Sequence, residues 1–200
     1  CWGSNGHGVL DLPEDLGQVV ALSVGHIHSC AIEADGSVQC WGRHNEGQSM
    51  VPTNLPDALA VAAGRNHSCA IDKDGDVTCW GENDYGQISV PTDLEEVVAI
   101  SLATYHSCAM EKQGDIRCWG LGGGTDVPTE EFRGISMVAG LFHTCAIETD
   151  GDLRCWGYNW NGQCDVPVDL EPVLGVAIGD SHSCAIEKNG NVRCWGLNDD

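Results

Sequence analysis

The chain has 200 residues, of which 30 are acidic and nine basic, so its formal net charge at pH 7 is −21. This charge argues against nucleic acid as a partner, because binding to phosphate requires a surplus of Lys and Arg, and against docking on anionic lipid. No apolar run approaches the ~18–20 residues that a membrane-spanning helix needs, and the length suits one domain of ordinary size.

The sequence is an internal repeat from end to end. The triplet Cys-Trp-Gly starts at positions 1, 40, 79, 118, 155 and 194, which gives four spacings of 39 residues and one of 37. A His-(Ser/Thr)-Cys-Ala segment precedes each of the last five triplets, and a turn such as Asp35-Gly36 lies between the two cysteines. We therefore treat 1–200 as a single repeat domain, with a partial unit at 1–12 and units at about 13–52, 53–91, 92–128, 129–167 and 168–200.

Each unit is predicted to be β-structure. Val19 to Val24 and Val97 to Leu102 are short apolar runs rich in β-branched residues, and the Asp-Gly signal between two alternating segments predicts a hairpin. No segment combines sustained helical periodicity with caps. Units of about 40 residues with about four strands have the size of a propeller blade. The sequence thus predicts an all-β β-propeller of ~39-residue blades, with five hairpin units and one N-terminal partial unit; a β-solenoid is the alternative.

The turn sets the register of the hairpin. A three-residue loop Ala34-Asp35-Gly36, with glycine in the left-handed conformation, makes Glu33 oppose Ser37. Counting back along both strands places two cysteines opposite each other in every unit, at positions without backbone hydrogen bonds, where side chains are closest. The facing pairs are Cys30 and Cys40, Cys69 and Cys79, Cys108 and Cys118, Cys145 and Cys155, and Cys184 and Cys194.

These facing pairs predict five cross-strand disulfides, since the separation is compatible with the bond. Disulfides indicate an oxidising compartment and hence a secreted or cell-surface protein. Zinc coordination and reduced core thiols are the alternatives, but no fourth zinc ligand recurs in the unit and the knuckle spacing of zinc sites is missing. Two cysteines fall outside the pattern, Cys1 and Cys164. We expect them to stay unpaired within the chain or to link two chains.

The recurrent pattern G-x-x-H…D-G-x-V…W-G-x-N-x-x-G-Q covers essentially the whole chain. It resembles the repeat of the regulator-of-chromosome-condensation superfamily, most closely the bacterial secreted branch that includes β-lactamase inhibitor protein II. The resemblance implies a β-propeller, commonly of seven blades. Seven units would need ~270 residues, so we expect the chain to be a portion of a longer polypeptide, with a five-bladed ring as the alternative. The nuclear member, an exchange factor for a small GTPase on chromatin, fits neither the expected disulfides nor the charge of −21.

Five histidines occupy the same position in successive units and are predicted to be scaffold rather than catalytic residues. They are His28, His67, His106, His143 and His182. A catalytic group needs only one copy, so a buried imidazole satisfied by the backbone is expected. Known catalytic motifs are missing, and we predict no catalytic residue, no metal and no cofactor. The segment Asp72-x-Asp74-Gly75-Asp76 is similar to a calcium loop but lacks the bidentate Glu, so a hairpin turn is expected there.

The strand directions place the two variable residues of each G-x-x-H segment and the W-G-x-N-x-x-G-Q loops at one end of every blade, which we call the top face. Large apolar side chains gather there, namely Ile27, Tyr85, Tyr105, Leu141, Phe142, Tyr158 and Trp160. Aromatic side chains on exposed loops are typical anchors of protein interfaces, although local packing is the alternative. The opposite face carries the acidic Asp-Gly turns, where calcium binding stays open.

Together these features predict a secreted or cell-surface, non-enzymatic propeller that binds a protein partner through its top face. Two alternatives remain: a structural repeat of an extracellular appendage or fibre, which would self-associate, and a glycan-binding module. Neither nucleic acid nor membrane insertion is expected.

Overall fold

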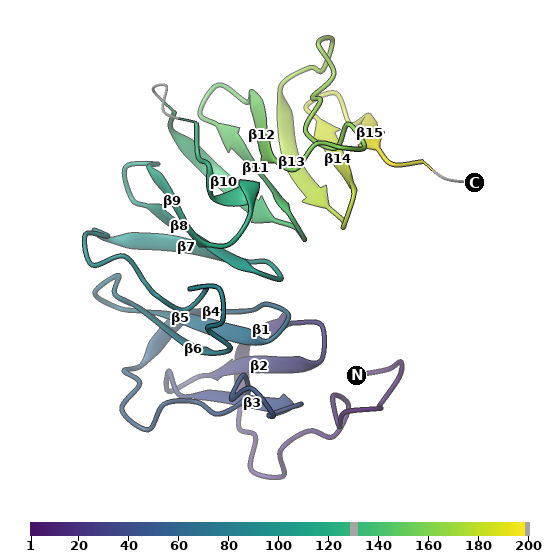
Figure 1. Cartoon of the computed structure of the whole chain (residues 1–200). Helices are drawn as coiled ribbons and strands as arrows, with labels where there is room; N and C mark the ends of the chain where they lie inside the picture. The colour runs from purple at the N-terminus through teal and green to yellow at the C-terminus, as the bar shows by residue number, and fades with distance from the viewer. Residues whose placement is uncertain (129–131, 199–200) are drawn as a thin grey trace.

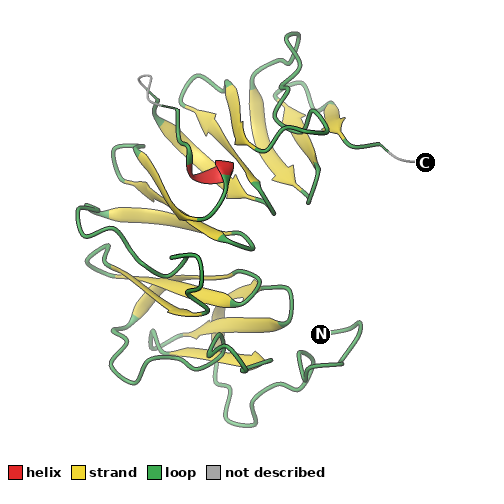
Figure 2. Cartoon of the chain, viewed as in Figure 1, coloured by secondary structure: helices red, strands yellow, loops and turns green. Residues whose placement is uncertain are grey.

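The computed structural model describes residues 1–128 and 132–198. In these ranges the regular structure is almost entirely β, in five three-stranded antiparallel sheets whose strands pair in sequence order (Figure 2). The first sheet contains β1 (Val19–Val24), β2 (His28–Glu33) and β3 (Val38–Gly42). The second contains β4 (Ala58–Ala63), β5 (His67–Asp72) and β6 (Val77–Gly81). The third contains β7 (Val97–Leu102), β8 (His106–Glu111) and β9 (Ile116–Gly120), and a 3₁₀ turn, η1 (Gly123–Thr125), follows it. The fourth contains β10 (Gly134–Ala139), β11 (His143–Glu148) and β12 (Leu153–Gly157), and the fifth β13 (Val173–Ile178), β14 (His182–Glu187) and β15 (Val192–Gly196).

The five sheets follow one another around an open arc, as the blades of a β-propeller (Figure 1). The first strands of consecutive sheets, β1, β4, β7, β10 and β13, contact one another, so they are the inner strands of the arc. The predicted fold class is confirmed. Each sheet has three strands rather than about four, because the segment that returns from the top face to the next inner strand forms no regular strand in the described residues. The predicted boundary between the third and fourth units, at 128 and 129, adjoins residues 129–131, which lie outside the described part.

The predicted hairpin register is confirmed in every sheet. In the first hairpin the Glu33 N–H donates to the Ser37 carbonyl at 2.9 Å, and Gly36 has a φ of 91°, a conformation that glycine adopts without strain. Cys30 faces Cys40, and the two form a disulfide with Cα atoms 4.1 Å apart. The other four predicted pairs form disulfides in the same way, with Cα separations of 4.0 or 4.1 Å. The alternatives of zinc ligands and reduced core thiols are therefore wrong for these ten cysteines.

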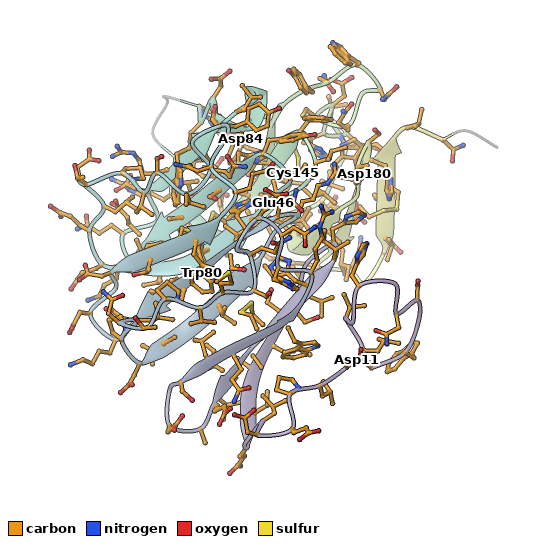
Figure 3. The ribbon with its side chains drawn as sticks, turned by 60° about the horizontal axis from the view of Figure 1, so that its bottom comes forward. Asp11, Glu46, Trp80, Asp84, Cys145 and Asp180 are labelled. Carbon is orange, nitrogen blue, oxygen red and sulfur yellow. A yellow bond between two sulfur atoms is a disulfide. The ribbon has the colours of Figure 1, made fainter. Side chains whose placement is uncertain are left out.

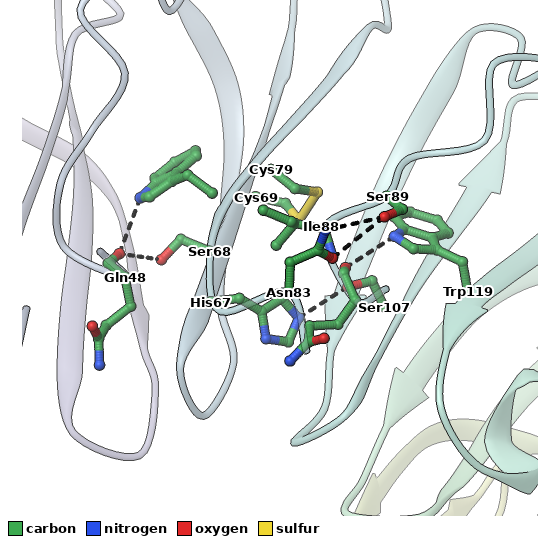
Figure 4. Close-up of a disulfide and its surroundings, with 12 residues drawn as sticks. Gln48, His67, Ser68, Cys69, Cys79, Asn83, Ile88, Ser89, Ser107 and Trp119 are labelled. Atoms are coloured by element: carbon green, nitrogen blue, oxygen red, sulfur yellow. Dashed lines mark hydrogen bonds between the residues drawn. A yellow bond between two sulfur atoms is a disulfide. The ribbon is translucent and has the colours of Figure 1, made fainter. Parts of the chain in front are cut away.

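A hydrogen-bonded relay joins each sheet to the next and explains why His, Ser and Trp repeat. Ser107 Oγ donates to the carbonyl of Gln87 at 2.8 Å, and Trp119 Nε1–H donates to the same carbonyl at 3.0 Å. The Ser107 proton is used in this bond, so His67 Nε2–H must donate to Ser107 Oγ, at 2.9 Å (Figure 4). Equivalent bonds join His28 to Ser68, His106 to Thr144 and His143 to Ser183.

The relay corrects the expectation that these imidazoles are satisfied by the backbone. Their partner is a hydroxyl of the next sheet, and within the described residues Nδ1 of His28, His67, His106 and His143 has no hydrogen-bond partner. Burial lowers the pKa of His28 to about 4, that of His67 to about 3 and that of His106 to about 4. The interior therefore holds neutral imidazoles, which is consistent with a scaffold role.

Apolar clusters fill the space between consecutive sheets, where Trp80 and Cys145 lie (Figure 3). Between the second and third sheets, for example, Ile71 packs with Val97 and Trp119 around the small side chain of Ala109. Alanine at this middle-strand position lets neighbouring sheets approach closely, so the hydrophobic core is divided into layers between blades rather than gathered at one centre.

The outer side of the fifth sheet is uncovered. Ile186 is 48% exposed and Val192 63% exposed, whereas their equivalents in the fourth sheet, Ile147 and Leu153, are 1% and 8% exposed. His182 is likewise exposed, because the hydroxyl that would receive its Nε2–H belongs to a following sheet in every earlier repeat.

Candidate functional site

The loops of the top face are held from beneath, so that their tips present side chains in fixed positions. In the loop between β6 and β7, Asn83 Oδ1 accepts the N–H of Ile88 at 3.1 Å, and Oε1 of the buried Gln87 accepts the N–H of Tyr85 at 2.9 Å. The same two bonds, from Cys164 to Asn159 and from Asn161 to Gln163, hold the loop between β12 and β13. The recurrent Asn and Gln are thus scaffold residues, and the positions between them are free to vary.

Five aromatic rings form one continuous row, which we call the aromatic ladder; three lie on these loops, and Tyr105 and Phe142 lie on the turns that follow β7 and β10. Tyr85 meets Tyr105 edge-on with ring centroids 5.1 Å apart, and Tyr105 stacks on Phe142 at 5.6 Å. Phe142 contacts Tyr158 at 5.2 Å, and Tyr158 stacks on Trp160 at 5.0 Å. Each separation lies in the range in which aromatic pairs attract each other. The ladder runs from the loop after the second sheet to the loop after the fourth.

A shortened loop gives the ladder room in its middle. The third unit has 37 residues between successive Cys-Trp-Gly triplets instead of 39, and three consecutive glycines, Gly122 to Gly124, lie at η1 in its loop after β9. At Gly123 an added Cβ would lie 3.1 Å from the backbone of Gly157, directly beside Tyr158. The glycine loop therefore packs closely against the start of the loop between β12 and β13, next to Tyr158.

The structure brings five of the seven predicted top-face residues together in the ladder. The other two lie elsewhere: Leu141 lines a cavity at the centre of the top face, and the half-buried Ile27 contributes its carbonyl to the loop after β3, accepting the N–H of Arg43 at 2.9 Å. Trp160 is 86% exposed at the end of the ladder, and Tyr85 and Tyr158 are also exposed, whereas Tyr105 and Phe142 are half-buried. The ladder is thus an apolar row whose two ends are more exposed than its middle.

The two remaining cysteines are free thiols with different surroundings. Cys1 is exposed and Cys164 is half-buried, where its thiol lies 3.4 Å from the carbonyl of Tyr158. Burial, and next the carboxylate of Asp165, raise the pKa of the Cys164 thiol to about 11. Cys164 is therefore a poor nucleophile at neutral pH.

The described residues hold no group of three or more His, Cys, Asp or Glu side chains that could bind a metal ion. The segment with calcium-like spacing forms the predicted hairpin turn, in which Asp72 Oδ1 accepts the N–H groups of Asp74 and Asp76. In the same described ranges, no helix has the length and apolar character needed to cross a bilayer.

The family model for the regulator of chromosome condensation (RCC1) repeat matches residues 19–48, 59–87, 135–163 and 173–200, more than half of the sequence. The chain belongs to the RCC1 repeat family. Residues 88–134, which the family model leaves unmatched, contain the third unit with its shortened loop. A search of curated proteins found no match to this RCC1-repeat chain. Its assignment to the bacterial secreted branch stays a prediction.

Solved structures similar to this RCC1-repeat chain include two plant receptor ectodomains. The ectodomain of the Physcomitrella patens receptor kinase CR4 superposes with a TM-score of 0.73 and 27% identity, over 89% of this chain and 50% of that one. The CRINKLY WD40 ectodomain of the Arabidopsis thaliana receptor kinase ACR4 gives 0.79 and 25%, over 100% of this chain and 76% of that one. Prp20p from Saccharomyces cerevisiae, whose binding to Gsp1p and histones is described, superposes with a TM-score of 0.76 and 23% identity, over 89% of this chain and 58% of that one. At this identity the similarity supports the fold alone. The chain thus spans half of the moss ectodomain.

Proposed function

We propose that this RCC1-repeat chain belongs to a secreted or cell-surface propeller without enzymatic activity that binds a protein partner through the aromatic ladder. The observation that carries the proposal is the continuity of the five rings. Tyr and Trp contribute large contact areas with few rotatable bonds, so they are over-represented among the residues that dominate binding energy. Three of the five rings lie on loops held by the Asn and Gln hydrogen bonds, and adjoining rings restrict one another, which reduces the entropic cost of association.

The stacking geometry favours a protein partner over a glycan. Sugar rings bind by stacking on the exposed face of an aromatic side chain. In the ladder the faces of Tyr105 and Phe142 are turned to each other, at an interplanar angle of 25°, and those of Tyr158 and Trp160 at 18°. The accessible part of the ladder is therefore mostly ring edge, which suits the apolar and carbonyl groups of a protein surface. A glycan would find a free ring face only at the two exposed ends of the ladder, Tyr85 and Trp160.

Two observations support an extracellular setting. Five disulfides are expected to persist only in an oxidising compartment. Two of the similar structures, at 27% and 25% identity, are described as receptor ectodomains.

The test is to recover partners by affinity capture from the extracellular fraction of the source and to measure their dissociation constants. Replacing Tyr105, Phe142 or Trp160 by Ala should weaken binding by about 1–3 kcal/mol each, or roughly 5- to 150-fold. Trp160→Ala is the cleanest variant, because this ring is 86% exposed and makes one ring contact, so the fold should be unaffected.

The matched controls are Asp35→Asn, Asp74→Asn and Asp150→Asn, which remove charge from the hairpin turns of the opposite face. They should leave the affinity unchanged. If these variants abolish binding and the ladder variants do not, the site lies on the acidic face and the proposal is wrong. Direct binding to a glycan array, together with loss of partner binding after the partner is deglycosylated, would favour the glycan alternative. Capture of the chain itself, sensitive to reductant, would favour the fibre alternative.

A further inference from the structure

A cavity of about 370 Å³ opens on the top face where the five inner strands end. A three-residue turn connects each inner strand to the next strand, and the middle residue of every turn lines this axial cavity. The five middle residues are His26, Arg65, Thr104, Leu141 and Asp180. The residue before each of them is glycine or alanine, whereas the middle residues share no chemical type. The repeat therefore builds the cavity walls and leaves this part of the lining free to vary.

The lining is polarised around the cavity. His26, Arg65 and Thr104 come from the first three sheets and offer hydrogen-bond donors. Leu141 and the strand end Leu102 are apolar. Asp180 comes from the fifth sheet, three sheets along the arc from Arg65, and is the one carboxylate that the described residues contribute to the lining.

Arg65 differs from the other arginines because it has no acidic partner among the described residues. Among residues 1–128 and 132–198, carboxylate oxygens lie within 4 Å of Arg43, Lys73, Lys112, Arg117, Arg133, Arg154 and Arg193. Lys188 contacts the carbonyl of Asp150. Arg65 is exposed and forms neither an ion pair nor a side-chain hydrogen bond in the described residues, in a chain with 30 acidic residues. Its guanidinium is therefore available to an external anion.

We propose that the axial cavity binds a single carboxylate group. The guanidinium of Arg65 presents two parallel N–H donors that match the two carboxylate oxygens, and the hydroxyl of Thr104 on the adjoining turn supplies a further donor. Leu102 and Leu141 offer an apolar wall to the aliphatic part of the ligand. Asp180 repels a second negative charge, so the site selects a monocarboxylate over a dicarboxylate or a phosphate dianion.

Two kinds of ligand present such a carboxylate group: an Asp or Glu side chain of a bound protein, and a free small carboxylic acid. The site stands on the cavity and on Arg65, and it does not require the aromatic ladder to bind anything. A failure of the ladder variants to affect partner binding would therefore leave this proposal intact, and the reverse also holds.

The test is a nuclear magnetic resonance titration that follows the backbone amides of Thr104 and Leu141. The probes are acetate, succinate and the peptide acetyl-Gly-Asp-Gly-amide, with acetyl-Gly-Asn-Gly-amide as the uncharged control. Acetate and the Asp peptide should produce saturable shifts, and the Asn peptide none. Arg65→Gln should weaken acetate binding by about tenfold or more, since charge-assisted bonds of this kind are strong. The matched control Arg43→Gln, a top-face arginine that lies beside Glu46, should bind as the wild type does.

The variants and probes also separate the two sources and test the selectivity. An Asp peptide that binds much more tightly than acetate identifies a protein side chain as the ligand, and the opposite order identifies a free acid. Asp180→Asn should admit succinate, which the wild type should reject. The proposal is overturned if neither acetate nor the Asp peptide gives a saturable shift, if the Asn peptide binds equally well, or if Arg65→Gln binds acetate like the wild type.

Discussion

The buried imidazole of His67 makes the stability of the fold sensitive to acid, and the size of the effect follows from its pKa. The pKa of His67 falls from 6.5 to about 3, first because of burial and then because of the neighbouring His28 and His106. Protonation in the folded state would charge a fully buried ring and place a second N–H on Nδ1, which has no hydrogen-bond partner in the described part of the chain. Below pH 6.5 the unfolded chain therefore binds a proton that the folded chain does not.

This difference in bound protons makes the free energy of unfolding fall as the pH falls. The stabilising contribution of neutral His67 is fully present above pH 6.5 and is lost as the pH falls from there towards 3. From pH 7 to pH 4.5 the free energy of unfolding should fall by about 2.5 kcal/mol on account of this one residue. Because the folded-state pKa lies well below 4.5, the result depends little on its value. His28 and His106, each with a pKa of about 4, should contribute similar losses.

The assay is urea denaturation at pH 7 and pH 4.5 without reductant, for the wild type and for His67→Gln. The glutamine amide of this variant still donates a hydrogen bond but does not titrate. The drop in unfolding free energy between the two pH values should be about 2.5 kcal/mol smaller in the variant, whatever its stability at pH 7, and contributions from carboxylates cancel in the comparison. His44→Gln, at an exposed position, is the matched control and should behave as the wild type does. Equal drops in the wild type and His67→Gln would refute the reasoning.

Other outcomes follow from the same contacts. Ser107→Ala should cost about 1–3 kcal/mol of unfolding free energy, because it leaves His67 Nε2–H buried without an acceptor; exposed Ser37→Ala should cost much less, and equal losses would speak against the relay. Alkylation of the unreduced, denatured protein should label Cys1 and Cys164 alone by intact mass, and ten or more labels would contradict the disulfides. In the native protein at pH 8, Cys164 should react far more slowly than Cys1, because its pKa is about 11; comparable rates would show that the thiol is not buried.

The strands and the disulfides could be predicted because they depend on contacts within one unit. A three-residue turn with glycine at Gly36 sets the pairing of the two strands beside it, and Cys30 and Cys40 follow by counting. β1 and β7 coincide with the apolar runs seen in the sequence. The partner of His28 could not be found in this way, because Ser68 lies 40 residues away in the next sheet. The constant spacing of the repeats was the signal that would have revealed it.

The top-face residues could be predicted as a group but not as a stack. Strand direction alone places Tyr105 and Phe142 at the same end of their sheets, yet their contact depends on how far the intervening glycine loop projects. The sequence showed that this unit is two residues shorter without showing what the shortening makes room for. Arg65 was missed because it belongs to a variable turn position, where the repeat carries no signal and only the arrangement of five turns around one axis gives it a role.

The placement of the cross-links has a mechanical consequence. Each disulfide joins two cysteines ten residues apart within one sheet, and none of the five connects two sheets. If the chain is pulled from its ends, sheets can therefore be detached one at a time, while each detached unit keeps a closed loop that bears no load. At ~3.3–3.6 Å per extended residue, that loop shortens every extension step by about 30–35 Å compared with the reduced chain. In a force-extension experiment, reductant should lengthen the steps by this amount.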